Sequence, residues 1–588
     1  MTHLLLALLF VPVALLLLGL IGSRLQTCSD VTSDLQENKA QPDYLYVLVH
    51  GMAPKDERWS AIETALQPHG HVLRLSYPAA YYSNADPKRI ALGIGAALHD
   101  ALRKTKAKHI TFVSHSMGAL LTRQAILDAR DSDWVEATRR VVFLAGVNRG
   151  WDIGGPPPAD ADPLERFAQK VLYWGARMVN MSELVLSFER GSPFVANLRL
   201  RWMKWVRDTK PNIEIVQMLG DIDDVVSRED NEDLRVIATG KFTQLIVRGT
   251  GHGEIVDIGT DGCPEDERHL RAYRRDKLVS AATADFDGLL AASEAQPFTT
   301  NENIKELVFV LHGIRDLGRW SAKFEEAIHK KYPDKQRTLR VVSPRYGYFG
   351  MGPFLFEGVR KRYVRWFMDE YTETLARYPA VANNEIRFFG HSNGTYLLAD
   401  ALSTYESMEI DRVVFAGSVV PKAFDWERLK KVDEATKEET QRVRAVRNYV
   451  GTEDWVVALF PRLFELPVVS SLFRNPIGSA GFNGFDREIQ QPLVVENVRF
   501  VRGQHSAYDS RIGEIVEFLM GNAAKAAEDK RSWVGIAMSS PLTVAAVWLT
   551  LVFLVVSLGA RVVAASPQPV WPVLVAYVLL VVMILRTV

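Results

Sequence analysis

The sequence has few cysteines and no excess charge of either sign, and each shortage excludes a class of protein. Only two of its 588 residues are cysteines, so neither a disulfide framework nor a metal site of the CxxC type is possible. Lysine plus arginine number 70, as do aspartate plus glutamate, which gives a net charge of zero. Nucleic-acid binders usually carry a basic excess, so we expect no nucleic-acid partner. The length exceeds what a single hydrophobic core supports and predicts two or three domains.

Charged residues are also missing from three long apolar runs near the two ends of the chain. The run at 4–22 has the length of a bilayer-spanning helix. No lysine or arginine precedes it and no A-x-A site follows, so a retained anchor over residues 1–24 is favoured over a cleaved signal peptide. The runs at 541–560 and 570–585 predict a transmembrane hairpin over residues 541–586. The sequence therefore predicts an integral membrane protein with about three spanning helices.

Lysine and arginine near the apolar runs indicate how the protein lies in the membrane. The hairpin loop contains one basic residue, Arg561. The large middle region has basic residues beside the runs at Arg24, Lys39, Lys525, Lys530 and Arg531. Because basic flanking segments tend to stay in the cytoplasm, we expect the middle region on the cytoplasmic side.

The middle region contains four motifs twice, in the same order. The first pair, YLYVLVHGM and LVFVLHGIR, is an apolar strand pattern followed by His-Gly, and RWSA opens a helical pattern shortly afterwards in both copies. The four pairs lie at 44–66 and 307–328, 110–121 and 386–398, 218–227 and 449–458, and 245–255 and 499–508. Chance does not explain four pairs in one order, so we predict two homologous domains, 43–292 and 303–523, joined by a polar linker.

Short β-branched runs alternate with longer amphipathic stretches in both copies. QLIVRG and LVVENVRFV are examples of the short runs. This alternation predicts the α/β class, in which a mostly parallel sheet is flanked by helices.

One motif in each copy places a serine between a strand pattern and a helix pattern. IRFFGHSNGTYLL contains G-x-S-x-G centred on Ser392, whereas ITFVSHSMGALL is centred on Ser116 and has Ser114 in place of the first glycine. A serine hydroxyl becomes a nucleophile when a base adjoins it, and a sharp strand-to-helix turn holds the hydroxyl clear of the sheet. Ser116 and Ser392 are therefore the predicted nucleophiles. The alternative is a small-residue turn without chemistry.

With these motifs both copies resemble the α/β-hydrolase superfamily, and within it the serine lipases and esterases. The resemblance implies two tandem α/β-hydrolase domains that need no metal ion and no organic cofactor. It also implies that the amides after His-Gly and after each serine form an oxyanion hole. These amides belong to Met52 and Met117 in the first domain and to Ile314 and Asn393 in the second.

In this superfamily an acid and then a histidine follow the nucleophile along the chain. Asp223 and His252 follow in the first copy, and Asp454 and His505 in the second. Each residue comes after a strand pattern, and parallel sheets gather their site residues at the carboxyl ends of the strands. We therefore expect each serine to form a triad with the acid and histidine of its own copy. A surface histidine without a catalytic role is the alternative for each base.

The acid of the first copy is ambiguous, because Asp221, Asp223 and Asp224 lie close together. Alignment of GDIDDVV with GTEDWVV puts Asp223 opposite Asp454, so Asp223 is preferred and Asp224 is the second choice. The histidine directly before each serine is expected to pack locally, since adjacent side chains on a strained turn point apart.

Insertions in both copies bear on the substrate. The resemblance implies a lid-like insertion at 151–211. Within it, LRLRWMKWVR at 198–207 suits either an amphipathic element at a bilayer surface or a cap helix packed on its own domain. The second copy has an aromatic and basic segment at 345–367 and an apolar one at 458–473. These suit an acyl-chain pocket, membrane contact or the interface between the copies.

The predicted function is ester cleavage by a membrane-anchored serine hydrolase with two sites, acting on lipids or other membrane-associated acyl esters. The expected partners are the ester substrate and the bilayer. An acyltransferase would form the same acyl-enzyme and pass it to an alcohol or amine, and the sequence does not separate the two. A binding or scaffold protein with one inactive copy is a third possibility, which two complete triads disfavour.

Overall fold

The structure is a computed structural model that describes residues 28–80, 83–152, 182–223, 225–226, 241–293, 300–313, 319–344, 354, 356–432, 439–466, 469, 477–490, 492–522, 526–565 and 571–587. Three predicted features lie outside these residues, namely the anchor at 1–24, Asp224 and Ile314, and the insertion at 151–211 is described only at 151–152 and 182–211. The chain divides into two compact units, Met1–Thr300 with Tyr371–Pro379 and Asn301–Glu370 with Ala380–Val588.

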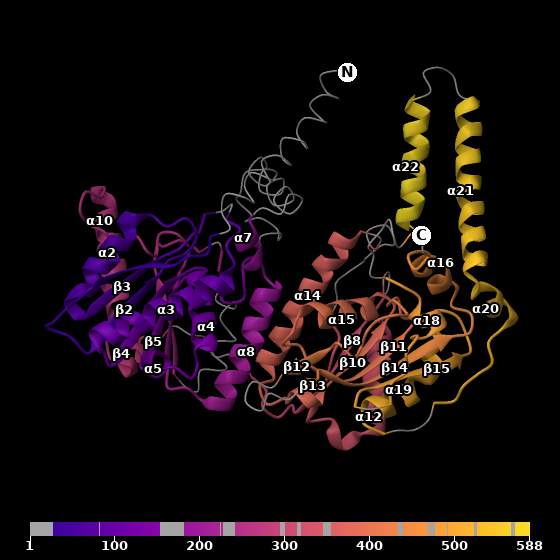
Figure 1. Ribbon diagram of the computed structural model, residues 1–588, viewed down its shortest axis with the longest axis horizontal. Coiled ribbons are helices and arrows are strands. Elements are labelled where there is room, and N and C mark those ends of the chain that lie inside the picture. Colours follow the sequence, from indigo (N-terminus) through magenta and orange to yellow (C-terminus); the bar gives the residue numbers. More distant parts are fainter. Residues whose placement is uncertain are drawn as a thin grey trace. The chain divides into compact units, whose positions relative to one another are not determined.

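The first unit is built on a seven-stranded sheet with the order β1-β3-β2-β4-β5-β6-β7 (Figure 1). All neighbouring strands are parallel except β1 and β3. The strands are β1 (Thr32–Gln36), β2 (Tyr44–Val49), β3 (His71–Ser76), β4 (His109–His115), β5 (Thr138–Leu144), β6 (Glu214–Gly220) and β7 (Phe242–Val247). The helices are α2 (Asp56–Leu66), η1 (Gln67–His69), α3 (Pro87–Thr105), α4 (Gly118–Asp128), α5 (Asp133–Glu136), α7 (Glu183–Ser187), α8 (Pro193–Thr209), α10 (Glu265–Thr283) and α11 (Phe286–Ala291).

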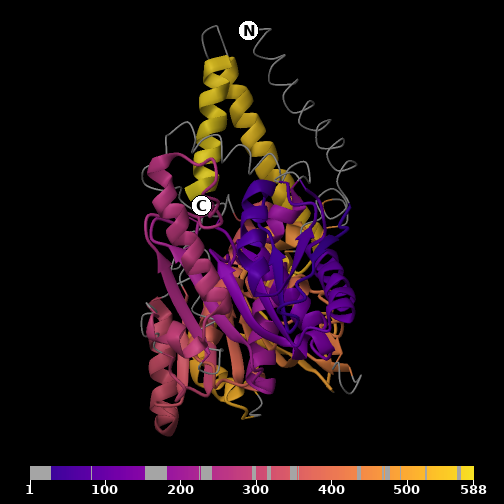
Figure 2. The ribbon, with the colours of Figure 1, turned by 90° about the vertical axis from the view of Figure 1, so that its left-hand side faces the viewer.

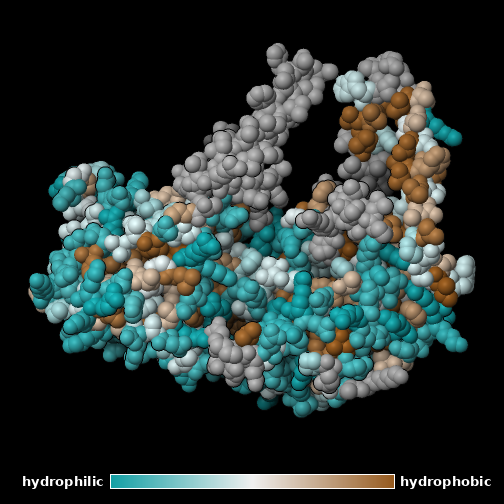
Figure 3. All heavy atoms as spheres, viewed as in Figure 1, coloured by the Kyte–Doolittle hydropathy of each residue, from teal (hydrophilic) through white to brown (hydrophobic). Residues whose placement is uncertain are grey.

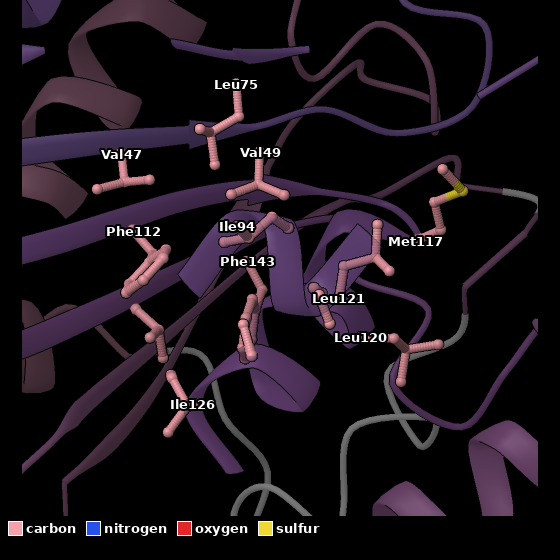
Figure 4. Packing of buried hydrophobic residues seen from close by; sticks show 14 of the residues in the cluster. Val47, Val49, Leu75, Ile94, Phe112, Met117, Leu120, Leu121, Ile126 and Phe143 are labelled. Carbon is pink, nitrogen blue, oxygen red and sulfur yellow. The ribbon is translucent and has the colours of Figure 1, made fainter. Parts of the chain in front are cut away.

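Apolar side chains cover both faces of this sheet. Val47 and Leu48 of β2 point to opposite faces, as successive strand residues do, and both are fully buried. Val47 belongs to a cluster that includes Ile94 of α3 and Leu121 of α4 (Figure 4). Leu48 belongs to a second cluster with Trp59 of α2. Because the sheet is packed on both faces, the strand ends that carry polar side chains are held in fixed positions.

The second unit is built on a six-stranded, fully parallel sheet with the order β15-β14-β11-β10-β8-β9. Its strands are β8 (Glu306–Leu311), β9 (Leu339–Val342), β10 (Ile386–His391), β11 (Ile410–Ala416), β14 (Val443–Gly451) and β15 (Val494–Val501), and β12 (Lys430–Val432) pairs separately with β13 (Glu439–Gln441). The helices after β8 are α12 (Arg319–Lys331), η3 (Pro333–Lys335), α14 (Glu357–Arg377), η4 (Asn383–Glu385), α15 (Asn393–Thr404), α16 (Trp455–Leu463), α18 (Ala480–Asn483), η5 (Ala507–Arg511), α19 (Ile512–Leu519), α20 (Trp533–Met538), α21 (Pro541–Ala564) and α22 (Trp571–Thr587).

The two sheets share one strand order. Counted from the His-Gly strand, β3-β2-β4-β5-β6-β7 and β9-β8-β10-β11-β14-β15 both read 2-1-3-4-5-6. The predicted α/β class is confirmed: both sheets are mostly or wholly parallel and are flanked by helices.

Helices α21 and α22 form an apolar hairpin after the second sheet. They lie side by side in two views at right angles, and hydrophobic residues gather along them (Figure 2, Figure 3). Gly559 allows this approach, because a Cβ there would come within 2.8 Å of the Tyr577 ring. The Tyr577 hydroxyl donates to the carbonyl oxygen of Val555 at 2.7 Å. Within the described part of the chain, α21 is the one helix long and apolar enough to cross a membrane.

Helix α8 contains the segment 198–207 that the sequence assigns either to a bilayer surface or to a packed cap helix. Trp202 is buried in the first unit, and the guanidinium of Arg123 lies 5.0 Å from its ring centre. The helix packs against α4. This tryptophan is therefore not available to a bilayer, and the packed arrangement is the one observed.

Candidate active sites

Each predicted nucleophile lies on a sharp turn between a strand and a helix. Ser116 follows β4 and precedes α4, and Ser392 follows β10 and precedes α15. Both serines have a φ of 51°, a left-handed conformation that is strained for a residue with a side chain. The amide of Ser116 donates to Leu144 O and that of Ser392 to Ala416 O, both at 3.0 Å. The turn is thus fixed by the neighbouring strand in both units.

Close packing explains the small residues around each serine. A Cβ on Gly118 would come within 2.6 Å of a carbonyl oxygen at the end of β2, and one on Gly394 within 2.4 Å of a carbonyl oxygen in β8. Ser114, which replaces the first glycine of the motif, is fully buried, and its hydroxyl lies 2.7 Å from Thr122 Oγ1. A satisfied hydrogen bond to α4 therefore accommodates the departure from G-x-S-x-G.

The structure brings Ser116, His252 and Asp223 into one hydrogen-bonded chain. His252 Nε2 lies 2.9 Å from Ser116 Oγ, and His252 Nδ1 lies 3.2 Å from Asp223 Oδ2. The Asp223 side chain is fully buried, and its Oδ1 accepts hydrogen bonds from the amides of Val225 and Val226, both at 2.9 Å. The carboxylate is therefore oriented by backbone donors while its other oxygen faces the imidazole.

Asp221, the other described candidate acid of the first copy, does not join this hydrogen-bonded chain. Asp221 Oδ1 accepts from the amide of Thr250 at 3.3 Å, which ties it to the loop before His252. Asp224 lies outside the described residues.

In the second unit the acid and the histidine form a close pair. His505 Nδ1 lies 3.0 Å and 2.9 Å from the two carboxylate oxygens of Asp454. Burial lowers the pKa of His505, but the charge of Asp454 and its hydrogen bond outweigh this effect and raise the pKa above the usual 6.5. Among the described residues, no hydrogen bond joins His505 to Ser392. Gly313 lies against this serine, since a Cβ there would come within 2.7 Å of its Cβ.

The histidine before each serine has a contact that the sequence reasoning missed. His115 Nε2 lies 3.0 Å from the carbonyl oxygen of His252, and His391 Nε2 lies 3.1 Å from that of His505. Both rings are buried, and burial and the nearby second histidine lower the pKa of each, to about 3 for His115. They pack locally, as expected, but against the loop that carries the predicted base. The occurrence of histidine at this place in both copies was the available signal.

The His-Gly loops lie beside the nucleophiles. His50 Nδ1 lies 2.8 Å from Gly51 O, and burial lowers the pKa of His50 to about 4. A Cβ on Gly51 would come within 2.9 Å of Ser116 Cβ. Within the described residues, neither Met52 N nor Met117 N donates a hydrogen bond to a protein acceptor. In the second unit His312 Nδ1 lies 2.9 Å from the carbonyl oxygen of Gly313. Asn393 is the first residue of α15.

One family of known proteins matches a segment of the first unit. Residues 39–148 match a family described as "Putative serine esterase (DUF676)", and this match supports a serine ester hydrolase. No match was found among the curated proteins. In the described part of the chain, no group of three or more His, Cys, Asp or Glu side chains is arranged to hold a metal ion.

Solved structures of lipases and esterases show weak likenesses to this chain. A monoacylglycerol lipase from Paleococcus ferrophilus is 12% identical over 43% of this chain and 99% of that one, with a TM-score of 0.28. Est1E from Butyrivibrio proteoclasticus is 17% identical over 43% and 96%, with a TM-score of 0.27. The Bacillus licheniformis lipase BlEst2 is 13% identical over 38% and 92%, with a TM-score of 0.26.

Proposed function

We propose that this protein is a membrane-anchored serine hydrolase with two active sites that cleave carboxylic esters. The observation that carries the proposal is the hydrogen-bonded chain from Asp223 through His252 to Ser116. Carboxylate, imidazole and hydroxyl stand there in the order that nucleophilic catalysis needs. The family match of residues 39–148 supports the same chemistry.

In the first site His252 removes the proton from Ser116 Oγ, which attacks the ester carbonyl carbon. Asp223 holds the imidazole in the required tautomer and stabilises its charged form. The amides of Met52 and Met117 stabilise the oxyanion of the tetrahedral intermediate. His252 then protonates the leaving alcohol. Water, deprotonated by the same histidine, hydrolyses the acyl-enzyme and releases the acid.

In the second site we assign the same roles to Ser392, His505 and Asp454, with the amides of Ile314 and Asn393 as the oxyanion hole. The pair of Asp454 and His505 supports this assignment. Catalytic hydrogen bonds to the nucleophile often form only when substrate is bound, so the missing contact to the serine is compatible with it.

We further propose that residues 43–292 and 303–523 are tandem homologous domains. The shared strand order and the equal positions of the motifs within the two sheets support a duplication. The shared φ of the two nucleophile turns supports it as well.

The membrane anchor in this proposal includes the hairpin of α21 and α22. Helix α21 has 24 residues and is therefore about 36 Å long, which suffices for a hydrocarbon core of about 30 Å. Two polar side chains of the hairpin are hydrogen-bonded within it: Thr550 of α21 donates to Ala546 O at 2.8 Å, and Tyr577 of α22 donates to Val555 O. Such pairing is what a lipid environment demands. The basic flanking residues favour a cytoplasmic position for the two domains.

Substrate hydrolysis in lipid vesicles tests this function. The full chain, Ser116→Ala, Ser392→Ala and the double variant would be supplied with p-nitrophenyl esters and with long-chain esters, and free acid would be measured. We expect each single variant to retain part of the activity and the double variant to lose it. Full activity in the double variant would contradict the proposal, and acyl transfer to an added alcohol without release of acid would assign a transferase instead.

A further inference from the structure

Helix α16 joins the second site to the base of the hairpin. Its N-terminal end belongs to the site, because Asp454 is its N-cap. The Asp454 carboxylate accepts a hydrogen bond from Val457 N at 3.1 Å while it also faces His505. The acid of the proposed triad is therefore fixed by the first turn of α16.

The other end of α16 is bound to the segment from which α21 starts. Arg462 donates to Met538 O at 2.5 Å and also to Ser539 O, the carbonyl groups of the last residue of α20 and of the residue after it. Trp548 of α21 donates from Nε1 to Leu459 O at 2.9 Å, and its ring packs edge-on against Phe460. Within the second unit α16 and α20 thus lie beside the base of α21 (Figure 1).

Large apolar side chains are exposed on these same elements. Trp533 of α20 is 80% exposed, Trp455 at the start of α16 is 50% exposed, and Ile536 and Leu542 are also exposed. We call these four residues the hairpin-base surface. Exposed Lys530 precedes Trp533 in the chain. Tryptophan with neighbouring lysine is the composition that proteins use at the headgroup level of a bilayer, and Leu542 lies in the first turn of α21, an apolar helix of spanning length.

We infer that the hairpin-base surface lies in the headgroup layer of the bilayer that holds α21, and that the second site takes its ester from that layer. The substrate class of the second site is then an acyl ester of a membrane lipid, and not a freely soluble ester. This inference rests on the proposed function. It involves the same ester hydrolysis, with water as the co-reactant, and adds the place from which the ester comes.

Two substrates offered to one site test the inference. The full chain with Ser116→Ala would be placed in phosphatidylcholine vesicles, where only the second site can act. Hydrolysis of a long-chain ester held in the vesicle is compared with that of soluble p-nitrophenyl butyrate. We expect Trp533→Ser with Ile536→Ser to lower the ratio of the two rates about tenfold, because much of the buried apolar contact is lost. Val432→Ser, an exposed apolar residue on β12, should change the ratio less than about twofold.

The outcomes separate this inference from the proposed function. If adding Ser392→Ala to the Ser116→Ala chain does not abolish hydrolysis, the proposed function fails. If Ser392→Ala abolishes hydrolysis but the Trp533→Ser and Ile536→Ser variant leaves the ratio of the two rates unchanged, the inference is overturned and the proposed function stands. A fall of both rates to zero would indicate a folding defect, and a second measurement then decides.

That second measurement places a label on the hairpin-base surface. With Cys28 and Cys263 replaced by serine, Trp533→Cys would be labelled with an environment-sensitive fluorophore in the same vesicles. We expect strong quenching by lipids spin-labelled near the headgroup, and weak quenching for a label at Val432→Cys. Equal quenching at the two positions overturns the inference. Energy transfer between labelled copies without lipid quenching also overturns it, and assigns the surface to a second copy of the chain.

Discussion

His115 Nε2 lies 3.0 Å from the backbone carbonyl oxygen of His252, so the residue before the nucleophile supports the loop of the proposed base. Burial and the nearby His252 lower the pKa of His115 to about 3, which keeps the ring neutral at physiological pH. A neutral ring with its proton on Nε2 can donate to this carbonyl without adding a positive charge beside the base. His391 and His505 have the same relationship in the second unit.

This contact predicts that His115 is a positioning residue. In a Ser392→Ala chain, His115→Ala should lower kcat about tenfold, which is the loss expected from one hydrogen bond that fixes the base. His115→Gln keeps an N–H donor and should recover most of that loss at equal thermal stability. Equal losses in the two variants would show that the ring acts by packing alone.

The two aspartates of the first site should differ sharply. Asp223→Asn should lower kcat of the first site roughly a thousandfold or more, because the amide no longer holds the imidazole in the right tautomer. Asp221→Asn is the matched control and should retain kcat within about threefold, since among the described residues the Asp221 side chain is hydrogen-bonded only to the Thr250 amide. The reverse order of effects would make Asp221 the acid.

The acidic limb of the pH profile should identify His505. The base must be neutral to act, and the pKa of His505 is raised above 6.5 by Asp454 against the effect of burial. In a Ser116→Ala chain, kcat/KM should therefore rise with pH through a midpoint above 6.5, and Asp454→Asn should move the remaining activity to a midpoint below 6.5. The same raised pKa makes charged His505 stabilising below pH 6.5, and this stability is lost as the pH rises through the folded pKa. A midpoint that does not move in Asp454→Asn would exclude the pair as its origin.

Ser114 should matter for stability and little for catalysis. Its hydroxyl and that of Thr122 are buried together, so Ser114→Gly leaves a buried hydroxyl without its partner. We expect the free energy of unfolding to fall by about 1 kcal/mol, with kcat of the first site changed less than about threefold. A double-mutant cycle with Thr122→Val measures the coupling, and additive effects would contradict a direct bond.

The parts of the fold that repeat were predictable from the sequence. Two sets of aligned motifs predicted a mostly parallel sheet with helices on its faces, because β-branched runs and turn glycines report local structure directly. The alignment also singled out Asp223, which the structure places against His252.

Contacts between distant segments were not predictable in the same way. The sequence pattern at 198–207 fits a bilayer surface as well as a packed helix, and the burial of Trp202 beneath Arg123 separates the two. The bond from His115 to the base loop joins residues 137 positions apart, and no local periodicity reports it. The hydrogen bond from Arg462 of α16 to Met538 O likewise joins residues far apart in the sequence, 76 positions from each other.

Covalent labelling with a fluorophosphonate, read by peptide mass spectrometry, tests the central claim most directly. The probe reacts with a serine only when a base activates it and an oxyanion hole receives the phosphoryl oxygen. We predict adducts on Ser116 and Ser392 in the full chain, an adduct on the remaining serine in each of Ser116→Ala and Ser392→Ala, and none in the double variant. Undiminished labelling of the double variant at another residue would contradict both nucleophile assignments.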